Sequence, residues 1–290
     1  MIHLDKDAFV KTLQRVSVQT GFLPTLVEKD YYLTLLLSNA CELSENLVFK
    51  GGTCLSKVFF SQYRLSEDLD FSMLLPQYEP TRGQRRECIR PVKENIADFC
   101  GQFGMRMDET SVPGRNESRQ YVYNILYRSV LRDVESRIKL EIGLRFNPIE
   151  AVKIHPVNHA FNHPFTGEPL FDGGRVVCLS LDELIAEKLR AAALRKTIAP
   201  RDFYDVDFIL RSGCDLKRVL GLFRKKLLED KAPSDISKYR ENLGRLEGEI
   251  TDMSFRIETE LLDVLSPSER QGFDLGKALK RINRAMNAAL

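Results

Sequence analysis

The segment KGGTCLSKVFFSQYRLSEDLDFSM, residues 50 to 73, limits the possible folds more than any other part of the sequence. A short apolar run ends at the paired glycines Gly51 and Gly52, and a second apolar run carries Asp68 and Asp70 two residues apart. Successive side chains of a strand point to opposite faces, so both carboxylates would share one face while their apolar neighbours face a core. The segment therefore predicts a strand, a tight turn, a helix and a second strand.

Two carboxylates this close repel each other, and one of them would be protonated unless a cation lay between them. A hard cation such as Mg²⁺ prefers oxygen ligands, and in two-metal phosphoryl chemistry such carboxylates bridge ions about 3.5–4 Å apart. The polar outer face of an edge strand is the better explanation of a D-x-D pattern taken alone. Asp68 and Asp70 are nevertheless candidate magnesium ligands and candidate catalytic residues, because of what precedes them.

The paired glycines form the other half of the pattern. Gly51 and Gly52 let the backbone approach a bound group closely, and the helix that follows presents free N–H groups to an anion. The spacing differs from the G-x(4)-G-K-[ST] phosphate loop, and a turn followed by an ordinary helix cap is the alternative explanation. Thr53 is expected to cap a helix from residue 54 to about 63. Together with the D-x-D strand, the glycines predict a site for a triphosphate chelated to magnesium.

Other side chains could complete such a site. Glu141 shares a strand face with Lys139, where it is either a third carboxylate ligand or part of a solvated face. Lys188 lies within the apolar stripe of a helix predicted at 181–196, where a lysine either extends to solvent or pairs with a triphosphate. Asp205 could orient Lys188 or contact a nucleotide hydroxyl. Two residues just before the acids are candidate phosphate contacts: Arg64 and Ser66.

The spacing of apolar residues divides the chain into an α/β or α+β first part and an all-helical second part. In the first part, helices are expected at 5–45, 54–63 and 81–104, strands at 47–49, 69–74, 121–127 and 137–143, and little regular structure at 145–175. The last two strands make a plausible antiparallel pair. In the second part, helices are expected at 181–196, 202–211, 215–230, 235–264 and 274–289. The boundary near residue 178 gives two domains, 1–178 and 179–290.

Composition is that of a globular protein. Of 290 residues, 43% are hydrophobic and 29% are charged, and the formal net charge of +2 does not by itself require a nucleic-acid partner. The six cysteines form no C-x-x-C pair, so a zinc ribbon or a thioredoxin-like site is not supported. There is neither a signal peptide nor the roughly 20 apolar residues of a membrane span, so a cytoplasmic protein with reduced thiols is expected.

Two further clusters are open to a plain explanation. His155, His159 and His163 are spaced by four, but nearby prolines interrupt any helix and no acid completes a ligand set, so loop positions are expected. A group of basic residues could contact RNA phosphates or form a solvated helix face: Lys217, Arg218, Arg224, Lys225 and Lys226.

These residues taken together resemble the AbiEii/AbiGii-type toxin nucleotidyltransferases of bacterial abortive-infection and toxin–antitoxin systems. The resemblance spans residues 27 to 205 and rests most on the R-x-S-x-D-x-D-F pattern with GGT upstream of it. The matching segments, in the order of the family, are Val27-Glu28-Lys29-Asp30-Tyr31-Tyr32, Lys50-Gly51-Gly52-Thr53-Cys54-Leu55, Arg64-x-Ser66-x-Asp68-x-Asp70-Phe71, Lys139-Leu140-Glu141-Ile142, Glu187-Lys188-Leu189 and Arg201-Asp202-x-Tyr204-Asp205.

The resemblance implies a polymerase-β-like nucleotidyltransferase core with a mixed sheet, followed by an all-helical C-terminal domain. It also implies magnesium-dependent transfer of a nucleoside monophosphate from an NTP, RNA targets such as tRNA acceptor ends, and a cognate antitoxin encoded alongside. In the scheme of the family, Asp68 and Asp70 hold magnesium, and Glu141 stands where the wider superfamily often has aspartate. Gly51, Gly52 and Ser66 would contact phosphate, and Lys188 and Asp205 would be essential residues of the second domain.

Two other functions stay open on the sequence. The same donor site would serve transfer of AMP or UMP to a protein hydroxyl, and basic residues lining the acceptor groove would distinguish RNA from protein as the acceptor. A module that binds nucleotide without turnover is the other alternative. The intact D-x-D and GGT argue against such a module, because a protein without catalytic activity has no reason to keep paired buried acids.

Overall fold

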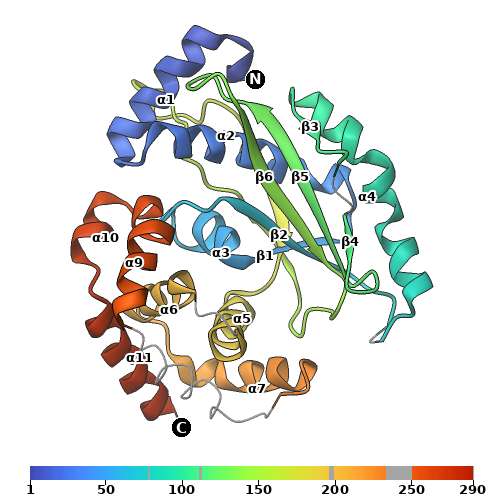
Figure 1. Cartoon of the computed structure of the whole chain (residues 1–290), viewed down its shortest axis with the longest axis vertical. Helices are drawn as coiled ribbons and strands as arrows, with labels where there is room; N and C mark the ends of the chain where they lie inside the picture. The colour runs from blue at the N-terminus through green and yellow to red at the C-terminus, as the bar shows by residue number, and fades with distance from the viewer. Residues whose placement is uncertain (78, 111–112, 196–198, 233–249, 290) are drawn as a thin grey trace. The chain divides into compact units, whose positions relative to one another are not determined.

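The computed structural model describes residues 1–77, 79–110, 113–195, 199–232 and 250–289 (Figure 1). The chain divides into two units, Met1–Leu179 and Ser180–Leu290. The first contains a β-sheet and helices, and the described part of the second is entirely helical. That the two are independent domains with a boundary at 178 stays a prediction.

A mixed eight-stranded sheet forms the centre of the N-terminal unit, with the strand order β3-β5-β6-β2-β1-β8-β7 and β4 paired to β5. The β1–β2 and β5–β6 pairs are antiparallel, whereas β2–β6 and β1–β8 are parallel, so the predicted β5–β6 pairing is confirmed. The strands are β1 (Leu47–Lys50), β2 (Asp68–Met73), β3 (Arg106–Met107), β4 (Gly114–Arg115), β5 (Gln120–Arg128), β6 (Glu135–Gly143), β7 (Lys153–Pro156) and β8 (Arg175–Cys178).

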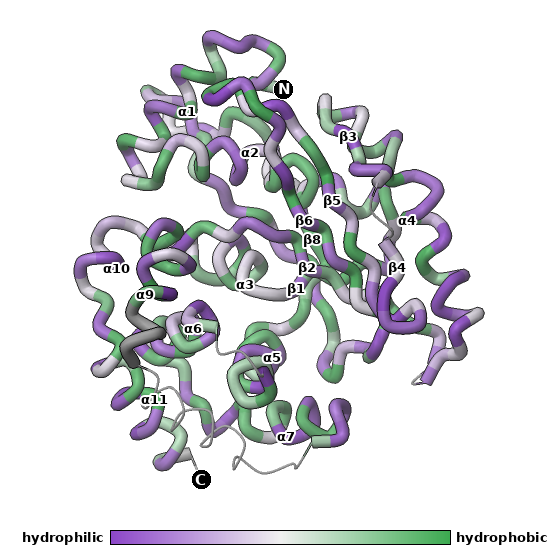
Figure 2. The backbone as a smooth tube through the Cα atoms, in the orientation of Figure 1, coloured by the Kyte–Doolittle hydropathy of each residue, from purple (hydrophilic) through white to green (hydrophobic). Residues whose placement is uncertain are grey.

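The two faces of this sheet differ in chemistry because the strands alternate apolar and polar residues. In β2, Leu69, Phe71 and Met73 are buried, and the acids point to the other face. Helices α2 and α4 cover the apolar face: a tyrosine of α2 contacts the Tyr127 ring of β5, and a lysine of α4 lies over the Tyr121 ring. Figure 2 shows hydrophilic residues recurring along α1 and α4. The carboxylates Asp68 and Asp70 lie on the opposite face.

Helices of the N-terminal unit largely follow the predicted pattern. Thr81 begins α4 with a reciprocal cap, its hydroxyl accepting from the Gln84 backbone N–H while the Gln84 side chain accepts from Thr81 N–H. The expectation of little regular structure at 145–175 missed β7, whose four residues carry no clear alternation. The helices are η1 (Ile2–Leu4), α1 (Lys6–Thr20), α2 (Pro24–Ser38), η2 (Ala40–Glu42), α3 (Gly51–Cys54), the π-helical turn η3 (Leu55–Phe59) and α4 (Arg82–Gln102).

The C-terminal unit is built from helices that bury one face against each other, with α5 against α6 and α7, and α6 against α11. The prediction of a helix at 235–264 falls partly outside the described residues, and α10 was not predicted because it is short and polar. Within the described ranges, no helix combines the length and apolarity that crossing a membrane requires. The helices are α5 (Leu181–Leu194), α6 (Pro200–Arg211), η4 (Leu216–Arg218), α7 (Leu220–Glu229), α9 (Ile250–Glu260), η5 (Leu262–Val264), α10 (Pro267–Gly272) and α11 (Leu275–Ala289).

Three consecutive charged residues of α2 each hold a different segment of the N-terminal unit. Glu28 accepts hydrogen bonds of 2.6 Å from the hydroxyl of Ser129 and from a backbone N–H of the β5–β6 connection. Lys29 Nζ lies 3.0 Å from a carboxylate oxygen just before β2. Asp30 Oδ1 lies 2.8 Å from Nζ of Lys57, in η3, and both side chains are buried. Helix α2 therefore braces the β5–β6 connection and the segment between the glycine turn and β2.

Asp30→Asn is expected to destabilise the protein by about 3–5 kcal/mol, because it leaves the buried Lys57 ammonium without its counter-charge. Urea denaturation followed by circular dichroism measures the effect. Lys29→Ala is the matched control: its ion pair partner is 40% exposed, so a loss of at most about 1 kcal/mol is expected. Equal losses in the two variants would contradict the assignment of the Asp30–Lys57 pair as the structural brace.

Candidate active site

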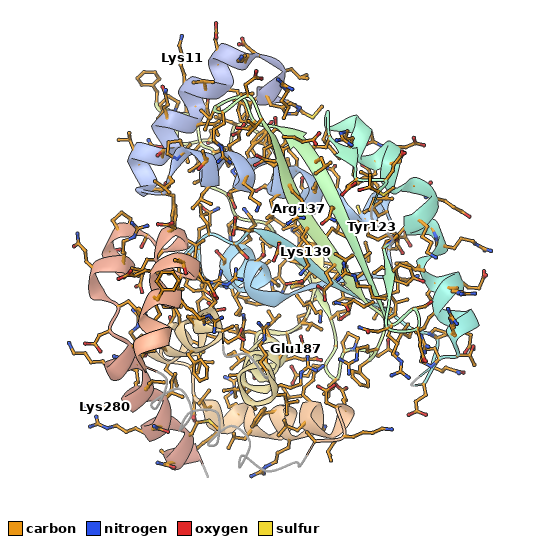
Figure 3. The ribbon with its side chains drawn as sticks, viewed as in Figure 1. Lys11, Tyr123, Arg137, Lys139, Glu187 and Lys280 are labelled. Carbon is orange, nitrogen blue, oxygen red and sulfur yellow. The ribbon has the colours of Figure 1, made fainter. Side chains whose placement is uncertain are left out.

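Pairing of strands brings three charged side chains into one row across the polar face of the sheet. Lys50 of β1 pairs with Asp70 of β2, and Asp70 pairs with Glu141 of β6. Two residues earlier in β2, Asp68 pairs with Lys139. The predicted acids Asp68, Asp70 and Glu141 thus lie on neighbouring strands of one face. Arg137 and Lys139, labelled in Figure 3, belong to this face of β6 by the same alternation.

The glycine turn passes directly against this row. Gly51 has φ +79°, a left-handed conformation that side chains disfavour, and an added Cβ would lie 2.6 Å from Oδ2 of Asp70. Helix α3 begins at Gly51, with Lys50 as its N-cap residue and no side chain capping it. The free N–H groups of a helix start therefore lie beside the Asp70 carboxylate, in the arrangement that a phosphate with a bound cation requires.

The prediction that Thr53 caps this helix is wrong, because the helix begins two residues earlier. The Thr53 hydroxyl instead donates to the backbone carbonyl of Asp68 at 2.5 Å and lies 2.6 Å from the Ser66 hydroxyl. These contacts hold the start of β2 against α3. Arg64 is buried, and its Nη1 donates to the carbonyl of Leu65 at 3.0 Å. A phosphate contact from Arg64 or Ser66 stays a prediction.

Lysines offset part of the repulsion among the acids. Burial raises the pKa of the Asp70 carboxyl; Lys50 and Lys139 oppose that shift, while Glu141 and Asp68 add to it. For Glu141, burial opposes ionisation, but Lys139 at 3.0 Å outweighs it and the pKa is lowered. Gln120 Nε2 also donates to Oε1 of this carboxylate at 2.7 Å. Of these two carboxyls, Asp70 is the one whose ionised form is disfavoured.

The donor set fits a divalent cation bound together with a nucleotide. Among the described residues, no three His, Cys, Asp or Glu side chains gather closely enough to hold a metal ion by themselves. Mg²⁺ in nucleotide sites is usually held by one or two carboxylates plus substrate phosphates and water, which is what Asp68, Asp70 and the glycine turn offer. Glu141 already has partners on both oxygens, so it would contribute alongside them.

In the C-terminal unit, the predicted contact between Lys188 and Asp205 is present. Lys188 Nζ lies 2.8 Å from Oδ2 of the fully buried Asp205 and 3.2 Å from Oδ1 of Asp202. Arg195 Nε lies 3.1 Å from the other oxygen of Asp202. Pro200 at the first position of α6 places Asp202 in its first turn, one turn of helix ahead of Asp205. Two acids and a lysine that is 13% exposed therefore meet on α5 and α6.

The prediction that Lys226 contacts RNA is wrong. It shares a helical face with Leu222 and Phe223 and is buried, with Nζ 2.7 Å from Glu183 and 3.3 Å from Glu187. Burial alone would lower the pKa of Lys226, but these glutamates outweigh it and the pKa is raised. The side chain joins α7 to α5, the helix on which Glu187 is labelled in Figure 3. The other basic residues of the group are exposed: Lys217, Arg218, Arg224 and Lys225.

The histidines have structural partners. His159 stacks on Phe171, with ring centroids 4.3 Å apart, and its Nε2 lies 3.0 Å from the Phe171 carbonyl oxygen. His163 Nδ1 accepts from backbone N–H groups of a tight turn. His155 lies in β7 beside the Phe59 ring. The six cysteines are free thiols.

Comparison with known proteins decides the family. The model of the family described as nucleotidyl transferase AbiEii toxin, type IV toxin–antitoxin system, matches residues 35–274. The chain belongs to this family. It is therefore a nucleotidyltransferase toxin of a type IV toxin–antitoxin system, which implies a nucleotide substrate and a cognate antitoxin. None of the curated proteins matches the sequence.

Solved structures share the fold at low identity. JHP933 from Helicobacter pylori has a TM-score of 0.56 and 16% identity, covering 92% of this chain and 93% of its own. MenT4, a nucleotidyltransferase toxin from Mycobacterium tuberculosis, has a TM-score of 0.52 and 17% identity, covering 95% of this chain and 98% of its own. The predicted fold class, a nucleotidyltransferase core with a mixed sheet followed by helices, is confirmed.

Three side chains of the candidate site were not singled out from the sequence as site residues. Lys50 and Lys139 supply the positive charge of the row, and Gln120 binds Glu141. Lys50 and Lys139 are the first residues of quoted motifs, and Gln120 directly precedes a predicted strand, but the importance of each depends on register. The D-x-D pattern of one strand does not predict which residues of the neighbouring strands pair with it.

Gly51→Ala is expected to lower nucleotidyl transfer at least about 100-fold, because its Cβ would displace the Asp70 carboxylate from its position. The left-handed conformation adds about 1–2 kcal/mol of destabilisation. Gly101→Ala is the matched control, since an added Cβ there meets nothing within 4 Å and a helix favours alanine. Full activity in Gly51→Ala, measured with purified protein and labelled NTP, would contradict a role of the glycine turn in holding Asp70 in place.

Asp70→Asn is expected to raise the thermal midpoint of the metal-free protein at pH 7 and to abolish transfer. Because folding raises the pKa of Asp70, the folded state binds more protons, and its stability falls as pH rises from the unfolded pKa, about 3.9, through the folded value. The gain, of the order of 0.5–2 kcal/mol, should therefore vanish near pH 3.5.

Differential scanning fluorimetry from pH 3.5 to 8 tests this behaviour. Asp108→Asn is the control, because hydrogen bonds from Thr110 lower the pKa of the exposed Asp108 carboxyl and its neutralisation should bring no gain at pH 7. A lower midpoint for Asp70→Asn at pH 7 than for the unmodified protein would show that the Asp70 charge stabilises the fold.

Proposed function

We propose that this AbiEii-family toxin is a magnesium-dependent enzyme that transfers a nucleoside monophosphate from an NTP to RNA, with the tRNA acceptor end as its target. The observation that carries the proposal is the row of Lys50, Asp70 and Glu141 in register across three strands, with the Gly51 backbone against the Asp70 carboxylate. Such a modification of tRNA would block translation, and the cytoplasm, where tRNA and NTPs meet, would be the place of action.

In this proposal the donor nucleotide binds through its triphosphate. Gly51 and Gly52 would present backbone N–H groups to phosphate oxygens, supported by Thr53, Arg64 and Ser66. Asp68 and Asp70, with Glu141 beside them, would hold magnesium. The bound ions would neutralise the triphosphate and the leaving pyrophosphate and lower the pKa of the acceptor hydroxyl.

The covalent step is an in-line displacement at the α-phosphorus. The acceptor oxygen forms the new P–O bond, the bond to the bridging oxygen of pyrophosphate breaks, and the acceptor proton leaves to solvent or to a carboxylate. With no enzyme nucleophile required, the chain contributes by positioning and charge stabilisation. Lys188, a candidate triphosphate contact, and Asp205, which orients it at 2.8 Å, are proposed as catalytic residues of the C-terminal unit.

RNA as acceptor is supported by exposed basic residues of η4 and α7. Lys217, Arg218, Arg224 and Lys225 are exposed, and Arg218 forms an ion pair with Asp182 at 3.0 Å. Phosphate contacts of this kind make affinity fall steeply with salt. Replacing Lys217, Arg224 and Lys225 by glutamine should therefore weaken tRNA binding and flatten its salt dependence without changing NTP binding.

The experiment that tests the function uses the purified protein with Mg²⁺, total bacterial tRNA and each α-labelled NTP in turn. Label is expected in tRNA with one preferred NTP, and at least about 1,000-fold less with Asp70→Asn. EDTA should abolish the labelling. Lys6→Gln, on the exposed start of α1, is the control variant and should label as the unmodified protein does. Label in protein instead of RNA would overturn the choice of acceptor, and no label anywhere would overturn nucleotidyl transfer under these conditions.

A further inference from the structure

Both oxygens of the Glu141 carboxylate have partners within the N-terminal unit. Lys139 Nζ lies 3.0 Å from Oε2, and Gln120 Nε2 donates to Oε1 at 2.7 Å. Lys139 comes from the same strand and the same face. Gln120 begins β5, where it pairs with Gly143, and its side chain reaches diagonally to Glu141. A carboxylate held at both oxygens has one orientation.

The Gln120 side chain is held in its turn. Asn116 Nδ2 donates to Oε1 of Gln120 at 3.0 Å. The amide of Gln120 can satisfy both neighbours in only one orientation, with its oxygen toward Asn116 and its NH₂ toward the Glu141 carboxylate, since a carboxylate accepts and cannot donate when ionised. The two contacts form a chain of hydrogen bonds from Asn116 to Glu141.

The turn that carries Asn116 is strained. Asn116, Glu117 and Ser118 have φ of 49°, 55° and 64°, three successive left-handed residues other than glycine. Each such residue costs about 1–2 kcal/mol, and such conformations persist where surrounding contacts enforce them, often at functional sites. Here Arg85 of α4, itself buried, donates to the Glu117 carbonyl at 3.2 Å, and Arg119 N–H donates to the Asn116 carbonyl at 3.0 Å.

We propose that Gln120 is a positioning residue that orients Glu141 beside Asp70, and that the left-handed turn at 116–118 serves to hold Gln120. The inference rests on the proposed function for the identity of the group that Glu141 serves, a divalent cation. Partners that hydrogen-bond metal-binding carboxylates fix their orientation, and losing one typically weakens metal binding 10–100-fold.

Mn²⁺ binding to the full chain, followed by the electron paramagnetic resonance of free Mn²⁺, tests the proposal without any turnover. Gln120→Ala is expected to weaken Mn²⁺ binding about 10-fold. Asn116→Gly keeps the left-handed backbone accessible and removes only the side chain, so it should weaken binding by a smaller factor. Gln14→Ala, on the exposed face of α1, is the matched control and should leave Mn²⁺ binding unchanged.

A role through Glu141 also predicts non-additivity. Glu141→Gln should weaken Mn²⁺ binding by itself, and Gln120→Ala should add nothing further in the double variant. Mn²⁺ affinities of Gln120→Ala and Asn116→Gly within twofold of the unmodified protein would overturn the proposal, as would fully additive losses or an unmodified protein that binds no Mn²⁺. If Gln120→Ala does not fold, Asn116→Gly carries the test.

The two proposals can fail separately. Mn²⁺ binding that depends on Gln120, in a protein that transfers no nucleotide to RNA or protein, would leave the positioning role intact and overturn the function. If the protein transfers nucleotide to tRNA but its Mn²⁺ binding does not depend on Gln120, the proposed function stands and the positioning role is overturned. In an active enzyme, the loss in Gln120→Ala should be recovered at high Mg²⁺, which a general folding defect would not show.

Discussion

Repulsion among Asp68, Asp70 and Glu141 is the constraint on which the structure of the N-terminal unit depends. Strand register places Glu141 beside Asp70, alternation along β2 keeps Asp68 on the same face, and burial raises the pKa of the Asp70 carboxyl. Lys50 and Lys139 offset part of that shift. Carboxylates held this close attract cations. The surrounding fold must also keep them from moving apart under their mutual repulsion.

Rigidity comes from contacts that converge on the segments around the acids. Helix α2 anchors the segment after the glycine turn through the buried Asp30–Lys57 pair, and Thr53 fastens the start of β2 to α3. The left-handed Gly51 lets the backbone come close to Asp70. The same principle applies in the C-terminal unit, where Lys226 joins α5 and α7 through buried glutamates. Charges inside each unit thus position the residues proposed for chemistry.

Much of this could be predicted from the sequence because it depends on local periodicity. Alternation placed Asp68 and Asp70 on one face, and helical spacing placed Lys188 in the apolar stripe of α5. The packing of α5 against α6 then brings Asp205 within 2.8 Å of Lys188. Register could not be predicted, so the roles of Lys50, Lys139 and Gln120 emerged only from strand pairing. The burial of Lys226 was missed for a related reason: a charge run does not show which of its members turns toward a neighbouring helix. The left-handed backbone of the 116–118 turn could not be predicted either, because none of its three residues is glycine.

The central claim is that the Asp68–Asp70 strand and the Gly51 turn form one site for a metal-chelated triphosphate. A crystal structure with Mn²⁺ and an NTP whose α,β-bridging oxygen is replaced by CH₂ tests it most directly. The account predicts an anomalous manganese peak contacting both Asp68 and Asp70, with phosphate oxygens on the backbone N–H groups that follow Lys50. Manganese bound elsewhere, or a triphosphate that does not touch the Gly51–Gly52 turn, would contradict it.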